Sequence, residues 1–287
     1  MLFYILNFFF VHSIKISLYG YKLNLKRISH FIIKSMYGLA VGAVFKNEGH
    51  CLAEWLNHYL VRGVEHFYLI DDGSTDRFEE VLEPYIVAAQ VTLFKAKWSR
   101  YMGRQRDMYN HYVLPRLCET QWLLMVDLDE FVWSPQAIDL RSVLATCGHI
   151  GQIQVEHTLF GSNGFVAQPA SIVNSFTRRS VDLPTADPGL RKYFVNSRFK
   201  FSSLNIHHAT FVDKTDELKN FKLLGPEVFR LNHYNCQSLE FWIEIKCRRG
   251  DCDEYKIRDD TYWNLYNLNE VEDLSLVSQN NKIESLA

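Results

Sequence analysis

The sequence predicts an α/β fold in which helices flank a mostly parallel, twisted β-sheet. Short apolar segments at 39–45, 66–70, 91–96 and 121–126 have the length and composition of buried strands. Helical segments separate these strands, so the strands are expected to pair in parallel through crossover connections. Polar residues follow three of the strands directly, and the carboxyl ends of parallel strands share one edge of a sheet. That edge is the expected binding site.

Three helices are expected between the strands, at 51–63, about 76–86 and 103–118. The first has apolar residues at helical spacing and closes with Gly63. The second follows the segment "DDGSTD", in which Asp76 or Ser74 can act as the N-cap. The first half of the chain therefore alternates strand and helix three times before it enters the fourth strand.

The pattern changes after residue 150. The segment "IGQIQVEHTLF" is typical of a strand and leads into a turn at 161–164. Further strands are expected at 193–201 and 205–212, and a helix is expected at 238–249. No internal repeat, low-complexity tract or clean linker divides the chain. One α/β domain with an elaborated C-terminal half is the simplest account.

Composition and charge narrow the classes of partner. Hydrophobic residues make up 47% of the chain and charged residues 22%, as in ordinary globular proteins. The net charge is −2, so nothing argues for nucleic acid or for an acidic polymer as a partner, and none is predicted. The six cysteines match no zinc pattern. A disulfide among Cys236, Cys247 and Cys252 is allowed but not required, so the redox compartment stays open. The sequence does not predict an oligomeric state.

The first 35 residues are expected to be a lead-in to the fold. The run "MLFYILNFFFV" is too short to span a bilayer comfortably, and the positive charges follow it. Three interpretations stay open: membrane association through residues 1–20, an amphipathic lead-in, or residues outside the fold. The charge order favours a cytoplasmic protein, or a membrane-associated one that faces the cytoplasm, over the lumen of the secretory pathway.

The segment Asp127-Leu128-Asp129 comes directly after the fourth strand. In extended backbone, residues i and i+2 face the same way, so both carboxylates would face one point while Leu128 faces the core. A hard divalent cation, Mn²⁺ or Mg²⁺, takes oxygen ligands and would compensate their charges. A helix cap or a solvated turn is the alternative. Glu130 would point away from Asp129 in a regular strand, so we expect it to support the metal ligands.

Other polar segments share the same edge of the sheet. Asn47 and Glu48 follow the first strand, and Asp71 and Asp72 follow the second. A carboxylate in such a turn can accept a hydrogen bond from the imide N–H of uracil or from a ribose hydroxyl. Asp72 is the first candidate for this role and Asp71 the second, and turn or capping chemistry alone is the alternative.

Together these segments resemble the GT-A type nucleotide-diphospho-sugar glycosyltransferases, most closely the family 2-like and family 92 (DUF23-type) group. The resemblance runs from about Ala40 to Asp260. It is carried by "AVFKNEGHCLAEWLNHYLVRGVEHFYLIDDGSTD", "WLLMVDLDEF", "FGSNG", "LNHYNCQSLEFWIEIKCRRG", the helical residues Arg104, Gln105, Arg106, Asn110 and His111, and the pair His207-His208. An Asp-x-Asp motif alone is a weak signal, but the combination is specific.

The resemblance implies a GT-A-like domain over 36–287, with a donor half at about 36–135 and an acceptor half at about 136–270. It implies a metal-dependent enzyme that moves a sugar from a nucleoside diphosphate sugar, with UDP as the usual carrier, to a glycan or other hydroxyl acceptor. Inversion is the expected outcome. Asp127 and Asp129 would hold the Mn²⁺ or Mg²⁺ ion.

Several further roles follow from the resemblance. His233, or one of His207 and His208, would complete the metal site or contact the diphosphate. The expected donor-binding residues are Asn47, Glu48, Asp71, Asp72, Arg104, Arg106, Asp127 and Arg249. The general base is not identified by the sequence, and the candidates by residue type are Glu156, Asp187, Asp213 and Glu130. His157-Thr158 replaces an aromatic residue that is usual in the family, which leaves the acceptor site open.

Three other classes of protein compete with this interpretation. Phosphatases and phosphotransferases of the haloacid-dehalogenase type use Asp-x-Asp after the first strand, whereas here the motif follows the fourth. Sugar nucleotidyltransferases need a basic, glycine-rich loop after the first strand, which "FKNEGH" is not. A non-catalytic, carbohydrate-binding relative of the same fold is the remaining alternative. The presence of Asp72, Asp127 and Asp129 argues against it.

Overall fold

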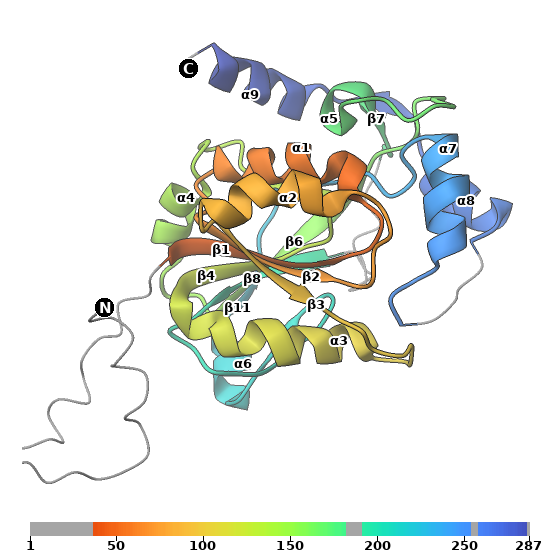
Figure 1. The fold of residues 1–287 in the computed structure, drawn as a ribbon. Coiled ribbons are helices and arrows are strands. Elements are labelled where there is room, and N and C mark those ends of the chain that lie inside the picture. The colour runs from red at the N-terminus through yellow and green to blue at the C-terminus, as the bar shows by residue number, and fades with distance from the viewer. Residues whose placement is uncertain (1–36, 182–190, 254–257, 286–287) are drawn as a thin grey trace, which may run out of the picture. The chain divides into compact units, whose positions relative to one another are not determined.

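The computed structural model describes residues 37–181, 191–253 and 258–285 (Figure 1). These residues all belong to one compact unit, Ser35–Ala287. The lead-in expected over 1–35 lies outside the described residues. The predictions of membrane association and of cellular location rest on that segment and stay predictions. Within the described ranges, no helix has the length and apolarity that crossing a membrane requires.

A nine-stranded sheet forms the centre of the described residues. Four neighbouring strands run parallel, in the order β3 (Val91–Lys95), β2 (His66–Asp71), β1 (Tyr37–Phe45) and β4 (Thr120–Met125). The sheet continues through β8 (Arg191–Asn196), β6 (Gln152–Leu159), β12 (Arg230–His233) and β5 (Glu130–Trp133), with β11 (Phe221–Leu223) beside β6. The predicted α/β fold with a mostly parallel sheet is confirmed.

Strand β8 runs against its neighbours. It is antiparallel to both β4 and β6, while β6 and β12 are parallel to each other. The start of β8 therefore lies at the edge where β1, β2 and β4 end. This reversal brings Lys192, near the start of β8, to the edge on which the sequence already placed the acids.

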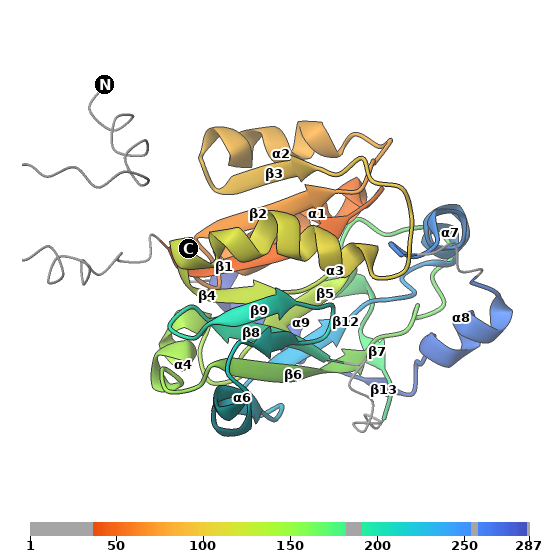
Figure 2. The same ribbon diagram turned by 90° about the horizontal axis from the view of Figure 1, so that it is seen from below.

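Helices cover both faces of the sheet (Figures 1 and 2). Helices α1 (Gly49–Leu60) and α2 (Phe78–Val87) pack on one face, in a core that includes Leu39 and Val41. Alternate residues of the same strand, including Ala40 and Val44, face the second core. Successive strand residues point to opposite faces, and both faces of β1 are covered. This explains why β1 is a continuous apolar run.

The helix predicted at 103–118 is a continuous helical segment made of three types of helix in succession. It begins as α3 (Arg104–Met108), continues as a π-helical turn (Tyr109–Val113) and ends as a 3₁₀ segment (Leu114–Glu119). Pro115 has no N–H to donate, so a regular α-helical ladder cannot continue through it. This segment packs on the second face of the sheet, beside a small hairpin of β9 (Phe201–Leu204) and β10 (Ala209–Phe211).

The strand predicted at 193–201 is two separate strands. Strand β8 ends at Asn196, whose side chain accepts from the N–H of Arg198 at 3.1 Å in a turn. The chain then forms the hairpin of β9 (Phe201–Leu204) and β10 (Ala209–Phe211), so the strand expected at 205–212 begins later than predicted. The turn that the Asn196 side chain stabilises therefore ends the strand, although the sequence suggested one continuous strand.

The rest of the C-terminal half consists of short elements. They are α4 (Leu140–Thr146), α5 (Ile172–Ser175), β7 (Arg178–Arg179), α6 (Lys214–Asn220), α7 (Leu239–Phe241) with a π-helical continuation (Trp242–Cys247), α8 (Asp260–Tyr266), β13 (Val271–Glu272) and α9 (Ser275–Glu284). Helix α9 returns to the first half of the chain, where buried Arg62 donates to Gln279 and Asn280. All six cysteines are free thiols.

Candidate active site

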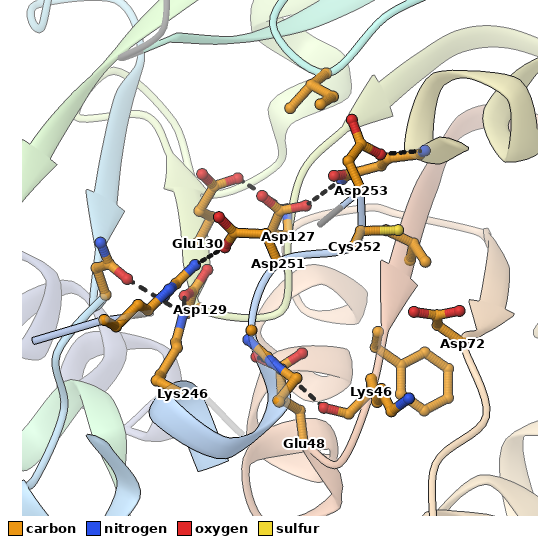
Figure 3. A pocket seen from close by; sticks show the side chains of 18 of the residues that line it. Lys46, Glu48, Asp72, Asp127, Asp129, Glu130, Lys246, Asp251, Cys252 and Asp253 are labelled. Carbon is orange, nitrogen blue, oxygen red and sulfur yellow. Dashed lines mark hydrogen bonds and ion pairs between the residues drawn. The ribbon is translucent and has the colours of Figure 1, made fainter. Parts of the chain in front are cut away.

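A cavity of about 400 Å³ lies where β1, β2 and β4 end and β8 begins. Its wall is built by the loops after β1 and β2, the turn after β4, the start of β8 and the segment after the π-helix of the C-terminal half. Figure 3 shows Asp127, Asp129 and Glu130 grouped on one side of the cavity, with Asp72 on the other. The cavity thus brings together acids from separate parts of the first half of the chain.

The acidic segment forms a turn and not an extended strand end. Strand β4 stops at Met125, and the N–H of Glu130 donates to the carbonyl of Asp127 at 3.2 Å. The Glu130 carboxylate folds back and accepts from the N–H of Asp127 at 2.8 Å. One oxygen each from Asp127, Asp129 and Glu130 lie within 4.8 Å of one another. The expectation that Glu130 points away from Asp129 is therefore wrong, because it assumed extended backbone.

Two aromatic residues of α1 hold this turn in place. The indole N–H of Trp55 donates to the carbonyls of Asp127 and Glu130, both at 3.1 Å. The Tyr59 hydroxyl donates to the Glu130 carbonyl at 2.9 Å and accepts from the N–H of Val132 at 3.0 Å. Both aromatic side chains are fully buried. Helix α1 therefore fixes the backbone of the acidic turn from beneath.

Two buried lysines compensate the two aspartates. The Nζ of Lys192 lies 2.6 Å from Asp127 Oδ2 and 3.5 Å from Glu130 Oε2. The Nζ of Lys246, in the π-helical segment, lies 2.5 Å from Asp129 Oδ2. Buried carboxylates are stable only when such partners are present. Part of the charge that a cation was expected to compensate is therefore compensated by the chain itself.

Burial and neighbouring charges act in opposite directions on these groups. Burial raises the pKa of Asp127, and Lys192 offsets only part of that rise. Burial acts in the same direction on Asp129, but Lys246 and His233 hold the pKa of that carboxyl well below its usual range. For Glu130, Lys192 and a nearby histidine outweigh burial and lower the pKa to about 2. Asp129 and Glu130 are therefore ionised at neutral pH.

Two histidines lie behind the acidic turn. His157 on β6 and His233 on β12 face each other with their Nδ1 atoms 3.2 Å apart. His157 Nε2 lies 3.1 Å from Glu130 Oε1, and His233 Nε2 lies 3.6 Å from Asp129 Oδ1. Burial lowers the pKa of His157 to about 4, so this ring is neutral at pH 7. Neutral imidazole nitrogen is the form that binds metal ions.

The donor atoms of the site fit a divalent cation. Two sets of three ligand atoms each lie within 4.8 Å of one another. One is the oxygen set Asp127, Asp129 and Glu130, and the other is the mixed set Glu130, His157 and His233. Mn²⁺ and Mg²⁺ accept carboxylate oxygens, and imidazole suits the first-row transition metals. A cation in the oxygen set would share both aspartates with the lysines.

Comparison with known proteins places the chain in a family. The sequence model of glycosyltransferase family 92 matches residues 39–272. This chain belongs to glycosyltransferase family 92. The resemblance noted in the sequence is thereby confirmed, and the glycosyltransferase class predicted from it is that of the family.

Curated members of family 92 are similar to about three quarters of this chain. A family 92 protein of Ricinus communis is 23% identical over 219 residues, which cover 74% of this chain and 38% of the relative. A family 92 protein of Oryza sativa subsp. japonica is 24% identical over 212 residues, which cover 72% of this chain and 35% of the relative. The chain therefore spans little more than a third of the length of these relatives.

Solved glycosyltransferase structures are similar to this chain with low TM-scores. S. aureus TarS 1–349 in complex with UDP-GlcNAc has a TM-score of 0.41 and 16% identity, covering 71% of this chain and 60% of TarS. A mannosyltransferase of Pyrobaculum calidifontis in complex with GDP-Man and Mn²⁺ has a TM-score of 0.30 and 16% identity, covering 43% of this chain and 36% of that one.

In this family 92 chain, Asp72 and Arg104 form a buried ion pair. Asp72 lines the cavity, whereas Arg104 lies behind it and also donates to the carbonyl of Cys252 at 2.5 Å. A planar guanidinium on two carboxylate oxygens fixes the orientation of that carboxylate. Arg104 is therefore placed to position Asp72 and does not itself face the cavity.

Glu48 and Arg249, two other predicted donor-binding residues, pair with each other in the cavity wall. Their side chains are 2.9 Å apart, and Arg249 also donates to the carbonyl of Lys46 at 2.7 Å (Figure 3). Both residues line the cavity. This pair connects the loop after β1 with the C-terminal half of the family 92 domain.

Asn47 and Asp71 hold the loops of this edge and do not line the cavity. Asn47 Oδ1 accepts from the N–H of Thr75, and Asp71 Oδ1 accepts from the N–H of Ser74, both at 2.7 Å. Asn47 has a positive φ of 54°, which asparagine tolerates better than most residues. Their oxygens already serve the turn, so the structure favours the alternative of turn chemistry over donor binding.

Arg106 and Glu156 do not line the cavity. Arg106 is exposed and pairs with Asp107 at 3.0 Å. Glu156 pairs with Arg191 of the neighbouring β8 at 3.3 Å. It adjoins His157, which faces the cavity, and successive residues of a strand face opposite sides. These placements do not favour the predicted roles of Arg106 in donor binding and of Glu156 as general base.

The other candidates have mixed placements. His207 lines the cavity and His208 is exposed. Asp213 caps α6 by accepting from the N–H of Thr215 at 2.8 Å, so its carboxylate has a structural role. Asp187 lies outside the described residues. Of the carboxylates named as general base, Glu130 alone among the described ones lines the cavity.

Sequence reasoning missed several groups in the wall, among them Lys192 and Asp253. Lys192 was missed because its place at the start of a strand does not show the direction of that strand, and therefore does not show at which edge of the sheet the lysine lies. Asp253 was missed as well, although it caps α3 by accepting from the N–H groups of Gly103 and Gln105 at 3.0 and 2.7 Å. The one available signal was the charged pair Arg191-Lys192 before "YFV".

Proposed function

We propose that this family 92 chain transfers a sugar from a nucleoside diphosphate sugar, with UDP as carrier, to a hydroxyl of a glycan or other acceptor. The observation that supports this most directly is the grouping of Asp127, Asp129 and Glu130 with two buried lysines at the carboxyl edge of the sheet. This arrangement offers both anionic ligands for a cation and fixed positive charge for a diphosphate.

The nucleoside is proposed to bind between the ends of β1 and β2. Val44 and Phe45 give this part of the wall an apolar surface, and Asp72 presents a carboxylate beside it. Arg104 holds that carboxylate in one orientation. A fixed acceptor next to an apolar surface suits a base whose edge carries an N–H, which supports a uridine nucleotide.

The diphosphate is proposed to lie over the acidic turn. Lys192 and Lys246 supply ammonium groups that are already fixed in place, so little reorganisation is needed when charge develops on the leaving group. A bound divalent cation supplies Lewis-acid stabilisation of that charge. Glu130 belongs to both ligand sets that could hold the ion. The chain's own task is to hold these ligands and lysines in fixed orientations.

The acceptor is proposed to enter beside α8. Tyr262 and Tyr266 line the cavity and stack at 4.6 Å, and Trp242 stacks on Tyr262 at 5.8 Å. Aromatic faces combine a flat apolar surface with a polar edge, which suits a sugar ring. This aromatic wall lies in the C-terminal half, where the acceptor half was expected from the sequence.

The test is transfer or hydrolysis of UDP-sugars with and without Mn²⁺, in wild type and in Asp129→Asn. We expect metal-dependent turnover in wild type and a loss of at least about 100-fold in the variant, because Asp129 lies at the proposed diphosphate site. Binding of UDP-sugar without any turnover would support the non-catalytic, carbohydrate-binding alternative. Neither turnover nor UDP binding with any metal would overturn the proposal.

A further inference from the structure

Asp251, in the cavity wall, has one carboxylate oxygen to which no described residue donates a hydrogen bond. Its Oδ1 accepts from Nη2 of Arg258, whereas its Oδ2 is unengaged. The side chain is 32% exposed and lines the cavity (Figure 3). A general base needs such an oxygen within reach of the hydroxyl whose proton it takes. Asp251 meets this requirement.

The other described carboxylates of the cavity wall have partners already. Asp72 accepts with both oxygens from Arg104, and Asp253 accepts with both from backbone N–H groups at the start of α3. The three acids of the turn after β4 each lie within 3.5 Å of a lysine. Glu48 pairs with Arg249, and its side chain is only 6% exposed. Among the described wall residues, the acid best placed to accept a new proton is therefore the one that follows this pair in the chain.

Contacts on both sides of Asp251 fix its segment to the first half of the chain. Before it, Arg249 donates to the carbonyl of Lys46 at 2.7 Å. After it, the carbonyl of Cys252 accepts from Arg104 at 2.5 Å. The backbone that carries Asp251 is thus held on either side, so little ordering of this carboxylate is needed when substrates bind.

Arg258 connects Asp251 with the aromatic wall of the cavity. Its guanidinium lies 5.2 Å from the ring centroid of Tyr262, which lines the cavity together with Tyr266. The arginine side chain is 9% exposed, yet Nε and Nη1 have no hydrogen-bond partner among the described residues. Burying such donors without a partner is costly. Unengaged donors and an unengaged acceptor therefore lie beside an aromatic surface, which suits a sugar ring with neighbouring hydroxyls.

We propose that Asp251 is the general base of the sugar transfer and that Arg258 orients both this carboxylate and the acceptor. The acceptor hydroxyl oxygen bonds to the anomeric carbon of the donor sugar. The bond from that carbon to the diphosphate breaks, and its electron pair leaves with the nucleoside diphosphate. The hydroxyl proton moves to Oδ2 of Asp251. The assignment rests on the proposed function, and it gives the role of base to a residue that the sequence did not indicate.

The test compares Asp251→Asn with Asp260→Asn, which changes an exposed acid in the first turn of α8. Full-length proteins receive Mn²⁺, UDP-sugars and methyl glycosides as acceptors, and kinetics are measured with the pair that wild type turns over fastest. We expect kcat of Asp251→Asn to fall at least about 100-fold, the loss typical of a missing general base. Asp260→Asn should match wild type.

UDP binding separates a lost base from a damaged fold. By calorimetry, Asp251→Asn should bind UDP within about threefold of wild type, because a group that acts only in the transition state leaves ground-state binding unchanged. A smaller loss of kcat, or a loss of UDP affinity as large as that of kcat, would overturn the assignment.

Chemical rescue separates a base from a residue that only holds Arg258 in place. Asp251→Ala leaves space for formate, whose carboxylate can take the proton instead. We expect formate to raise the rate of Asp251→Ala at least about tenfold. Arg258→Met keeps the base, so formate should not change its rate, and the variant should mainly raise the KM for the acceptor. No rescue of Asp251→Ala contradicts the assignment. Failure of the proposed function looks different, because wild type itself would then turn over no UDP-sugar.

Discussion

The sheet has a parallel part, β1 to β4, and a mixed part, which contains β6, β8 and β12. The parallel part brings acidic side chains to the cavity, and the mixed part brings basic ones. Strands β1, β2 and β4 lead into carboxylates: Glu48, Asp72 and the acidic turn. Strands β6, β8 and β12 present His157, Lys192 and His233. The acids come from strand ends that all run one way, whereas the bases come from strands of both directions. Each part alone would carry uncompensated buried charge, so the cavity is stable only when both parts are in place.

The largest expected effect comes from removing the lysine that joins the two parts. Lys192→Met leaves Asp127 and Glu130 without a buried countercharge. We expect a loss of about 3–5 kcal/mol in the free energy of unfolding, measured by urea denaturation. Lys95→Met is the control, because its pair with Glu79 is exposed and should leave the midpoint nearly unchanged. Equal effects of the two variants would contradict the compensation between the two parts.

The two parts should also respond to acid in different pH ranges in the metal-free protein. Burial lowers the pKa of His157 from 6.5 to about 4, and Lys192 with His157 lowers that of Glu130 from 4.5 to about 2 against the effect of burial. Both folded pKa values are depressed, so each contribution is complete above the unfolded value and lost on acidification. The His157 contribution falls between about pH 6.5 and 4, and that of Glu130 between about 4.5 and 2.

Each contribution is on the order of 3 kcal/mol in the free energy of unfolding. Urea unfolding at a series of pH values measures it. His157→Gln should flatten the upper range, where the buried His58 and the half-buried His207 also titrate, and Glu130→Gln should flatten the lower one. Unchanged slopes in both variants would show that neither group is buried as described.

A smaller effect is expected from the buried pair within the parallel part. Arg104→Lys replaces the two-point contact on Asp72 by a single ammonium contact, so the carboxylate loses its fixed orientation. UDP affinity should fall about tenfold, which corresponds to about 1.4 kcal/mol. Arg106→Lys on the same helix is exposed and should bind UDP as wild type does. Calorimetric titration with UDP compares the two, and equal losses would remove Asp72 from the nucleotide site.

The sequence predicted the parallel part well for a local reason. Each of its strands is an apolar run covered on both faces, and the acids directly follow those runs, so spacing alone located Asp72 and Asp127 at one edge. The orientation of Glu130 was not predictable, because Trp55 and Tyr59 of α1 fix the turn through tertiary hydrogen bonds. A turn that is closed by distant residues leaves no local pattern.

The mixed part was harder to predict because its contacts join distant residues. Lys192 reaches the cavity only because β8 runs antiparallel between β4 and β6. His157 meets His233 across 76 residues, through the pairing of β6 with β12. Neither strand direction nor pairing can be read from a short apolar segment. For the same reason the sequence could not show that His157, and not the general-base candidate Glu156 beside it, faces the cavity.

The smallest effect is therefore expected at Glu156. In Glu156→Gln the half-buried pair with Arg191 is weakened, which should change the free energy of unfolding by less than about 1 kcal/mol. Transfer activity should stay within about threefold of wild type, because the side chain lies on the side of β6 away from the cavity. Steady-state kinetics with a UDP-sugar that the wild type turns over checks this. If the turnover rate instead fell by about two orders of magnitude while KM stayed unchanged, Glu156 would be restored as the general base, and β6 would have to present its other face to the substrate.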